Sequence, residues 1–518
     1  MVFFAALMIL YKDTRALDPA RYRYTDVVIK GIAPGGGLFV PERIPSMTVA
    51  EIVALASLSY PLRAAAVHRA FEVDVPSPRL EELLHVAFGP NFDHPAVAPV
   101  VEVAPGMHVL ELWHGPTSAF KDMALQCMPL FFSEAVAVRH AEGRAVSDYL
   151  VLVATSGDTG KAALEGFADR GFTRIVVFYP ADGVSDIQRK QMVTQRGSNV
   201  CVFGVRGNFD DCQNAVKAAF NDHAFNEELL QKRGIRLSSA NSINWGRLLP
   251  QIVYYVSAYA DLVAAGAVES GGTVDVCVPT GNFGNILAAM YAKRVGVPIG
   301  RLLCASNENK VLSDFIATGT YDIGNRAFVT TPSPSMDILI SSNLERGLYE
   351  LTGDPEAVRG WMAALVDEKR FKLDPARLAA LRDEMQGDWV GNDESLLTIN
   401  RVFSETGYLM DPHTAVAWEV AERLRGSAPM LVASTAHWAK FGADVYKALR
   451  GVSYDASLPA DVAGMTGLQL LDEVRRMAPD VSVPRNLAEL ESLPERFNQV
   501  VDRTDQAVED ALRDWLAL

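Results

Sequence analysis

The sequence has few cysteines, no apolar run long enough for a membrane span, and no excess of basic residues. Five cysteines occur among 518 residues, and no two of them form a Cys-x-x-Cys pair. An odd and scattered set argues against a disulfide framework and a zinc site. It indicates reduced thiols, so we expect a cytoplasmic protein without a structural metal.

The charge balance is acidic, with 48 Lys and Arg against 63 Asp and Glu, a net charge of −15. Nucleic acid and anionic membrane surfaces are therefore not expected as partners. A small anionic substrate is compatible with this net charge, because basic residues at a binding site can create a local positive potential. The apolar start MVFFAALMIL is too short to span a bilayer, and it lacks the basic segment and cleavage site of a signal peptide. We interpret residues 1–20 as an extension of unknown role.

What the sequence does contain is an alternation of apolar strands and helices. Hydrophobic residues make up 49% and charged residues 21%, which is typical of a globular chain of two or three domains. In residues 148–180, a buried strand, a TSGDTG loop, a helix and a second buried strand follow one another. Such continuous apolar strands predict a parallel sheet covered on both faces. Elsewhere we expect a β-like run in 21–45, helices in 48–93 and 353–405, a loop-rich region in 306–350, and helices in the last sixty residues.

The stretch ELWHGPTSAFKDMALQ, residues 111–126, carries the first candidate for chemistry. A hydroxyl of Thr117 or Ser118 is placed to cap a helix that begins just after it. Lys121 then falls in the first turn, where the helix dipole disfavours its charge. A lysine that loses its proton easily is a nucleophile toward carbonyl carbons. The alternative is an ordinary surface lysine. We also expect Pro129 to kink or split this helix.

Three further loops follow predicted strands, at the sheet edge where open α/β sheets bind ligands. The first, TSGDTG at 155–160, opens a helix and predicts an anion site. It is not a nucleotide-binding P-loop, because Thr155 stands where the first glycine belongs and Ala162 where the Ser/Thr metal ligand belongs.

The second loop, TGNFGN at 280–285, has two glycines that allow close approach of an oxyanion, and a plain turn is the alternative. The third, SANSINWGR at 239–247, places Arg247 in the first turn of a helix. An arginine there suits a bound anion, and a capped helix with a solvated arginine is the alternative.

Together these segments resemble the threonine synthase family, pyridoxal-phosphate enzymes of fold type II. The matching motifs are HGPTSAFKD, TSGDTGKAA, GNFDDCQ, SPSMDI, TGNFGN, DPHTA and STAHWAKF, between about residues 22 and 450. They are more similar to the longer branch in bacteria and fungi than to the plant-like branch. Trp245 and Trp438 depart from the smaller residues or proline of the family pattern.

The resemblance implies a fold of the tryptophan-synthase-β type, with two mostly parallel α/β domains. It divides the chain into an N-terminal domain at 1–100, a large cofactor domain at 101–147 and 236–450, a small mobile α/β domain at 148–235, and a C-terminal helical extension at 451–518.

The resemblance also implies the cofactor pyridoxal 5'-phosphate and the conversion of O-phospho-L-homoserine and water into L-threonine and phosphate. Lys121 is then the Schiff-base lysine and the acid/base. The cofactor would be held by Lys121, Gly281, Asn282, Phe283, Gly284, Asn285 and Thr435. The substrate carboxylate would be bound by Ser156 and Thr159, and its phosphate by Asn241, Ser242 and Arg247. We expect a monomer or homodimer.

Two alternatives stay open at this point. One is a phospho-lyase or dehydratase of the same fold that releases 2-oxobutyrate. The other is a non-catalytic protein that binds a phosphorylated metabolite, which would not need the intact Lys121.

Overall fold

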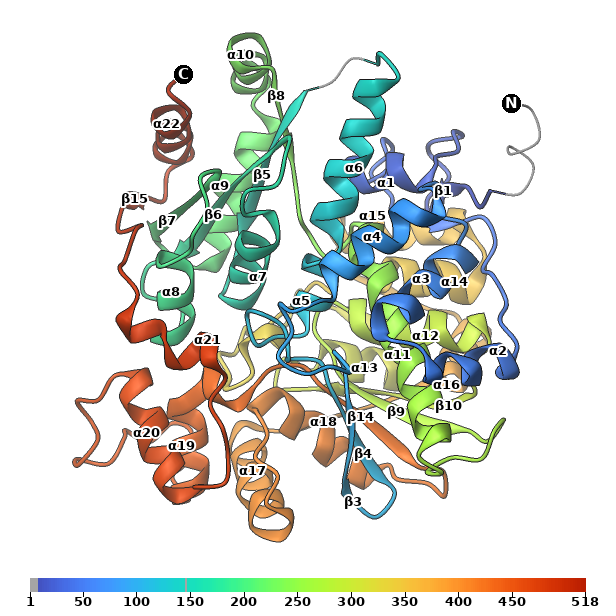
Figure 1. Cartoon of the computed structure of the whole chain (residues 1–518), viewed down its shortest axis with the longest axis vertical. Coiled ribbons are helices and arrows are strands. Elements are labelled where there is room, and N and C mark those ends of the chain that lie inside the picture. The colour runs from blue at the N-terminus through green and yellow to red at the C-terminus, as the bar shows by residue number, and fades with distance from the viewer. Residues whose placement is uncertain (1–7, 145–146) are drawn as a thin grey trace.

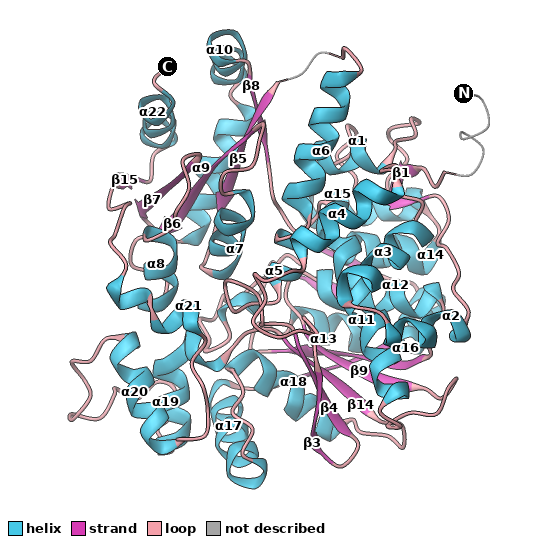
Figure 2. Cartoon of the chain, in the orientation of Figure 1, coloured by secondary structure: helices cyan, strands magenta, loops and turns pink. Residues whose placement is uncertain are grey.

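The computed structural model describes residues 8–144 and 147–518, and two parallel sheets dominate it (Figures 1 and 2). The large sheet has the order β13-β10-β9-β14-β4-β3, and all its pairs are parallel except β3 with β4. Its strands are β3 (Val100–Ala104), β4 (Met107–Glu111), β9 (Val274–Pro279), β10 (Ile299–Ser306), β13 (Met385–Trp389) and β14 (Met430–Ser434). The central strands β9 and β14 are buried along their whole length, as their continuous apolar sequences predict.

Helices connect the strands of the large sheet and cover it, as parallel strands require. They are α5 (Lys121–Leu125), α6 (Met128–Ala141), α11 (Trp245–Ala264), α12 (Gly284–Val295), α13 (Val311–Thr318), α14 (Leu344–Thr352), α15 (Pro355–Asp367), α16 (Pro375–Glu384), α17 (Asn392–Thr406), α18 (Pro412–Arg423) and α19 (Gly442–Arg450). None of the helices in the described ranges is both long and apolar enough to cross a membrane.

The second sheet lies apart from the first in Figure 2 and has the order β15-β7-β6-β5-β8, with every pair parallel. Its strands are β5 (Asp148–Ala154), β6 (Thr173–Pro180), β7 (Val200–Arg206), β8 (Ile235–Ser238) and β15 (Val500–Asp502). Its helices are α7 (Asp158–Phe167), α8 (Asp186–Val193), α9 (Phe209–Asn221), α10 (His223–Arg233) and α22 (Asp505–Leu516). The strand-helix alternation predicted from residue 148 onward is confirmed here.

The N-terminal region is mainly helical, and two of its predictions need correction. Its elements are β1 (Tyr11–Asp13), α1 (Tyr24–Lys30), β2 (Phe39–Pro41), α2 (Val49–Ala54), the 3-10 helix η1 (Leu55–Ser57), α3 (Tyr60–Ala70) and α4 (Ser77–Ala87). Within 21–45, where a β-like run is expected, the structure has the helix α1 as well as the short strand β2. Residues 1–20 are not wholly an extension, because β1 pairs with β2 inside this region; residues 1–7 lie outside the described part.

Three other regions can be compared with their expectations. The region 306–350, expected to be loop-rich, has loops between the short elements α13, β11 (Thr320–Asp322), the 3-10 helix η2 (Pro334–Met336) and the start of α14. The helical region 353–405 also contributes β12 (Arg370–Lys372) and β13. The C-terminal residues are helical apart from β15, which joins the edge of the second sheet. The remaining elements are η3 (Trp438–Phe441), α20 (Gly467–Met477), α21 (Arg485–Ala488) and η4 (Leu490–Ser492).

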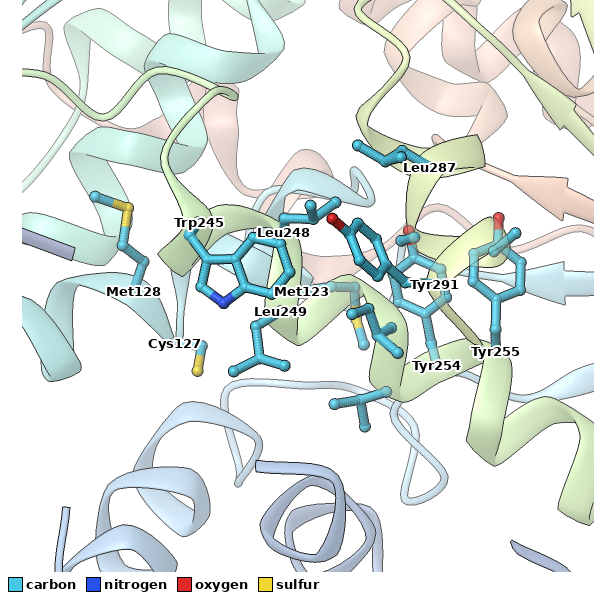
Figure 3. Packing of buried hydrophobic residues seen from close by; sticks show 14 of the residues in the cluster. Met123, Cys127, Met128, Trp245, Leu248, Leu249, Tyr254, Tyr255, Leu287 and Tyr291 are labelled. Carbon is cyan, nitrogen blue, oxygen red and sulfur yellow. The ribbon is translucent and has the colours of Figure 1, made fainter. Parts of the chain in front are cut away.

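Helix α11 forms the centre of the main hydrophobic core. Figure 3 shows Trp245 at its first turn with Cys127 and Met128 nearby, and Tyr254 and Tyr255 farther along the same helix. The Trp245 ring is fully buried and contacts the rings of Tyr11 in β1, Phe71 directly after α3, and Tyr291 in α12. The large residue that departs from the family pattern therefore fills the space between the N-terminal region and the large sheet.

Candidate active site

The candidate site lies where the carboxyl ends of parallel strands from both sheets face each other. Strands β4, β9 and β14 lead into the segments that contain Lys121, TGNFGN and Thr435, and β5 and β8 lead into TSGDTG and the Arg247 loop. Parallel strands place their carboxyl ends at one edge, so these five segments converge although they lie far apart in sequence.

Lys121 is the first residue of α5, and its side chain is almost fully buried. Its Nζ donates to the Ser335 hydroxyl at 3.0 Å and lies 3.6 Å from Oδ2 of Asp158. The surface-lysine alternative is therefore wrong. Pro129 divides the predicted helix as expected, into α5 and α6.

The predicted hydroxyl cap of this helix is wrong. Residue Phe120 occupies the N-cap position, and no side chain caps α5. The Thr117 hydroxyl instead donates to Oδ1 of Asp122 at 2.7 Å, and the Thr117 amide donates to Oδ2 at 2.8 Å. The buried carboxylate of Asp122 thus accepts both the amide and the hydroxyl proton of Thr117, and it fixes the loop before Lys121.

Burial, rather than the start of a five-residue helix, is the main cause of the lowered pKa of Lys121. Burial lowers the pKa of Lys121 from 10.5 to about 8. The charges of Lys440 and Arg247 act in the same direction, and the nearby Asp158 carboxylate opposes them. A substantial share of this amine is therefore neutral near physiological pH.

Asp158 connects two lysines in the interior of the site. Its Oδ1 lies 2.6 Å from Nζ of Lys440, a fully buried lysine, and its Oδ2 accepts from the Ser335 hydroxyl at 3.1 Å. Burial alone would raise the pKa of Asp158, but the charges of Lys440 and Lys121 outweigh it and hold the pKa well below its usual range. Asp158 is therefore a fixed anion that orients both lysines.

A glycine next to Asp158 makes this arrangement possible. Gly157 has a φ of 137°, and a Cβ there would lie 2.4 Å from the amide carbon of Gln188. That close approach lets Gln188 donate to Oδ1 of Asp158 at 3.0 Å. In the same loop, the Thr155 hydroxyl accepts from the amides of Gly157 and Gly160.

Ser156 and Thr159, the predicted carboxylate ligands, flank Asp158 and are half-buried. Neither hydroxyl has a hydrogen-bond partner within the described chain. The TSGDTG loop thus has two free hydroxyls at the start of α7, a ten-residue helix, where an anion is favoured.

Ser335 and His413 were not among the predicted site residues, although SPSMDI and DPHTA were noted as motifs. The Ser335 amide donates to Nε2 of His413 at 3.1 Å, so the imidazole proton lies on Nδ1, 2.6 Å from Oδ2 of Asp411. His413 therefore holds the backbone of Ser335, whose hydroxyl contacts Lys121. The motif positions were the available signal, but only the fold shows that these side chains reach Lys121.

The TGNFGN loop lies against the same Ser335. A Cβ on Gly281 would lie 2.7 Å from the Ser335 carbonyl oxygen, so only glycine fits there. Phe283 has a φ of 65° and precedes the first turn of α12, which begins at Gly284. Asn282 is exposed.

Asn285 supplies an unpaired donor at the start of α12. Its Oδ1 accepts from the hydroxyls of Tyr254 and Tyr255, at 2.7 and 2.5 Å, while its buried Nδ2 has no partner in the part of the chain that the structure describes. The first amides of a helix also lack partners within the helix. This combination is suited to bind a phosphate.

Arg247 is the most informative residue of the third loop. It is 3% exposed and donates from Nη1 to the Ala240 carbonyl at 2.8 Å, and its buried Nε has no partner within residues 8–144 and 147–518. Among the described residues no carboxylate pairs with it, and burial lowers its pKa to about 10. A buried unpaired charge is costly, which favours a bound anion beside it. Asn241 is exposed and accepts a hydrogen bond from the half-buried Ser242, so these two lie nearer the surface.

Thr435 follows β14 at the same edge. Its backbone carbonyl accepts from the Phe120 amide at 2.8 Å, which ties it to the Lys121 loop. The neighbouring Ser434 hydroxyl bonds to Trp113 and Thr414, whereas the Thr435 hydroxyl has no partner in the described chain. Of the two hydroxyls, that of Thr435 is the one left for a ligand.

Three family models match the chain in order. Residues 10–88 match "Threonine synthase N terminus", residues 102–435 match "Pyridoxal-phosphate dependent enzyme", and residues 414–512 match "Threonine synthase, C-terminal". The likeness therefore extends beyond the predicted limits of 22 and 450, and it includes most of the residues interpreted as an N-terminal extension.

Relatives and solved structures agree with these matches. Threonine synthase-like 1 of Macaca fascicularis is 43% identical over 452 residues, which cover 85% of this chain and 59% of that protein. Threonine synthase of Pseudomonas aeruginosa is 38% identical, with 88% and 93% covered. Yeast threonine synthase superposes with a TM-score of 0.86 at 32% identity, with 98% and 99% covered. The pyridoxal-phosphate-bound threonine synthase from Brucella melitensis superposes at 0.83 with 38% identity, again with 98% and 99% covered.

The chain spans about three fifths of the threonine synthase-like 1 proteins that it matches, as the 59% coverage shows, and nearly the full length of the bacterial and yeast synthases. The predicted fold, type II with mostly parallel sheets, and the predicted cofactor class are confirmed by the family match and the structural neighbours. The chain belongs to the threonine synthase family of pyridoxal-phosphate-dependent enzymes.

Proposed function

We propose that this protein is a threonine synthase that converts O-phospho-L-homoserine and water into L-threonine and phosphate. The observation that carries the proposal is the buried Arg247, which pairs with no carboxylate in the described chain. Its charge is also close enough to the buried Lys121 to lower the pKa of that lysine. A site with an amine nucleophile and a second, separate anion pocket fits a phosphorylated amino acid. Incubation with the cofactor and phosphohomoserine, followed by assay of threonine and phosphate, tests it directly.

The residues present fit pyridoxal phosphate. Gly281, Asn282, Phe283, Gly284 and Asn285 would hold its phosphate, because the loop offers the first amides of α12 and the orphaned Nδ2 of Asn285. The Thr435 hydroxyl would face the ring nitrogen, and Lys121 Nζ would bind the aldehyde carbon. When bound, the cofactor supplies an electron sink for carbanion chemistry.

The side chains around Lys121 divide the remaining tasks. Lys121 would remove the proton at the substrate Cα once its amine is free. Asp158 and Lys440 would keep that amine oriented, and the Ser335 hydroxyl is in hydrogen-bond contact with both Lys121 and Asp158. Ser156 and Thr159 would bind the substrate carboxylate. Asn241, Ser242 and Arg247 would bind its phosphate.

The capture of cofactor by apoprotein should depend on pH. Only neutral Lys121 attacks the aldehyde, so the capture rate should rise with pH and level off above about 8. Lys440→Met removes a positive charge near Lys121, so Lys121 becomes the lysine that neutralises Asp158. The pKa of Lys121 should rise, and the pH profile of cofactor capture should move to higher pH. Asp158→Asn should move it to lower pH. Stopped-flow absorbance of cofactor binding measures both, and a midpoint that neither variant moves would contradict the assigned causes.

The Thr435 hydroxyl should contribute the net value of one hydrogen bond to cofactor affinity. Thr435→Val keeps the shape of the side chain and should weaken cofactor binding by about 1 kcal/mol. Ser434→Ala is the matched control, since the Ser434 hydroxyl already bonds to Trp113 and Thr414. Fluorescence titration with pyridoxal phosphate gives both affinities. An unchanged affinity in Thr435→Val would mean that another group faces the ring.

A second candidate is a phospho-lyase that releases 2-oxobutyrate. It is favoured by the 43% identity to threonine synthase-like 1, a protein named apart from the synthases. Both reactions need Lys121 and Arg247 and differ in how water is handled late in the reaction. Chromatography of the products from phosphohomoserine separates the two, because one yields threonine and the other 2-oxobutyrate with ammonia.

Other expectations stay proposals. The five cysteines are all buried and unpaired in the described chain, which supports the proposed cytoplasmic location. We propose a monomer or homodimer, and the acidic composition supports the proposal that nucleic acid is not a partner. The boundaries of the four domains and the movement of 148–235 are likewise proposed, and the location of TSGDTG in that segment supports closure around the substrate carboxylate.

A further inference from the structure

The loop before Lys121 has little regular structure of its own, and its carbonyl groups are held by distant elements. The Thr117 carbonyl accepts from Lys440 at 3.0 Å and from Gln191 of α8 at 3.3 Å. The Ser118 carbonyl accepts from the His437 amide at 3.1 Å. The geometry of the loop therefore depends on partners far away in sequence.

The third carbonyl of this series, that of Pro116, is held by the C-terminal segment. Asn486 of α21 donates from Nδ2 to the Pro116 carbonyl at 2.7 Å and to the Ser118 hydroxyl at 3.0 Å. The Ser118 hydroxyl in turn lies 3.2 Å from Oδ1 of Asn486. A carbonyl oxygen only accepts, so the amide nitrogen of Asn486 must face it, and the orientation of this side chain is fixed.

Ser118 is a residue that needs such support. It is fully buried and has a φ of 56°, a left-handed conformation that is uncommon outside glycine. Conformations of this kind persist only where the surrounding structure holds them. Ser118 precedes Lys121 by three residues, so relaxation of its backbone would displace Nζ from Ser335 and Asp158.

The segment that carries Asn486 is itself anchored on the second sheet. The Arg496 amide donates to the Val193 carbonyl at the end of α8, and Glu495 pairs with Arg189 at 2.9 Å. Strand β15 then pairs with β7. Asn486 is thus held on one side by the sheet that carries TSGDTG and contacts the lysine loop on the other.

We propose that Asn486 is a positioning residue for Lys121: its side-chain amide holds the Pro116–Ser118 backbone in the conformation that directs Nζ into the site. The activity part of this inference rests on the proposed function, whereas the backbone part does not. Asn486→Ala and Asn486→Asp both remove the N–H donors, and Asn486→Asp keeps the size of the side chain and an acceptor for Ser118. Asn498→Ala is the matched control, an exposed asparagine of the same segment.

The test uses the full-length, cofactor-loaded protein. Hydrogen–deuterium exchange should show the amides of Ser118 and Phe120 exchanging at least about fivefold faster in both Asn486 variants, with the strands of both sheets unchanged. The kcat for threonine formation should fall by about tenfold with KM within about twofold. Asn498→Ala should match the wild type in both measurements.

Unchanged exchange at residues 117–121 would overturn the inference, and so would faster exchange throughout the protein, which would show a general loss of stability. An unchanged kcat in both Asn486 variants would also overturn it. If the wild type formed no threonine, the proposed function would fail, and the exchange measurement would still decide the role of Asn486.

Discussion

Lys121→Ala should abolish the covalent link to the cofactor and lower turnover by at least about a thousandfold. Under the proposed function, the variant would lack both the amine that binds the aldehyde carbon and the base at the substrate Cα, and each role is worth orders of magnitude. The alanine replaces a buried amine whose partners are a serine hydroxyl and Asp158, so the fold should persist. Borohydride reduction followed by mass spectrometry detects the link, and a threonine assay measures turnover.

Lys161→Ala is the matched control for this experiment. Lys161 lies in the neighbouring TSGDTGK segment, but its Nζ pairs with Glu165 at 2.9 Å and not with a site residue. The control should keep the borohydride-reducible link and most of the activity. If Lys121→Ala retained normal turnover, Lys121 would not be the cofactor lysine, and the proposed function would lose its central residue.

Arg247→Leu should lower kcat/KM for phosphohomoserine by about ten- to a hundredfold. A hydrogen bond from a charged group to a buried anion is worth roughly 1.5–3 kcal/mol, and the guanidinium, whose Nε has no partner among the described residues, can form one. Cofactor affinity should change little, because a different loop, 280–285, would hold the cofactor phosphate. Steady-state kinetics and a cofactor titration separate the two effects.

The same variant should have a distinctive effect on stability. Without ligand, Arg247 is a buried charge that pairs with no carboxylate of the described residues, so Arg247→Leu should leave the melting temperature unchanged or raise it. Arg346→Leu is the contrasting control: Arg346 is also buried, but it donates to the Phe39 carbonyl and to Asn343. That variant should lower the melting temperature clearly. If Arg247→Leu released the cofactor or destabilised the fold as Arg346→Leu does, Arg247 would not be the residue that binds the substrate phosphate.

The sequence alone determined the elements whose signal is local. The apolar strands of both sheets, the loops at their carboxyl ends and the split at Pro129 follow from hydrophobic pattern and turn chemistry. The sequence predicts Lys121 and Arg247 as site residues because each is positively charged and lies in the first turn of a helix, where the helix dipole disfavours a positive charge. The family resemblance assigned the loops to ligands.

Only the tertiary structure decided features that depend on neighbours far away in the chain. β13 and β15 have little strand signal, and they are strands because an edge of a sheet offers them hydrogen bonds. The predicted cap at Thr117 gave way to Asp122 because that carboxylate is buried beside it. The pKa of Lys121 falls because the fold buries its amine and brings up Lys440 and Arg247, from segments more than a hundred residues away. Burial and the distance between two charges are defined only in the folded chain, so they cannot be predicted from a pattern of residues along the sequence.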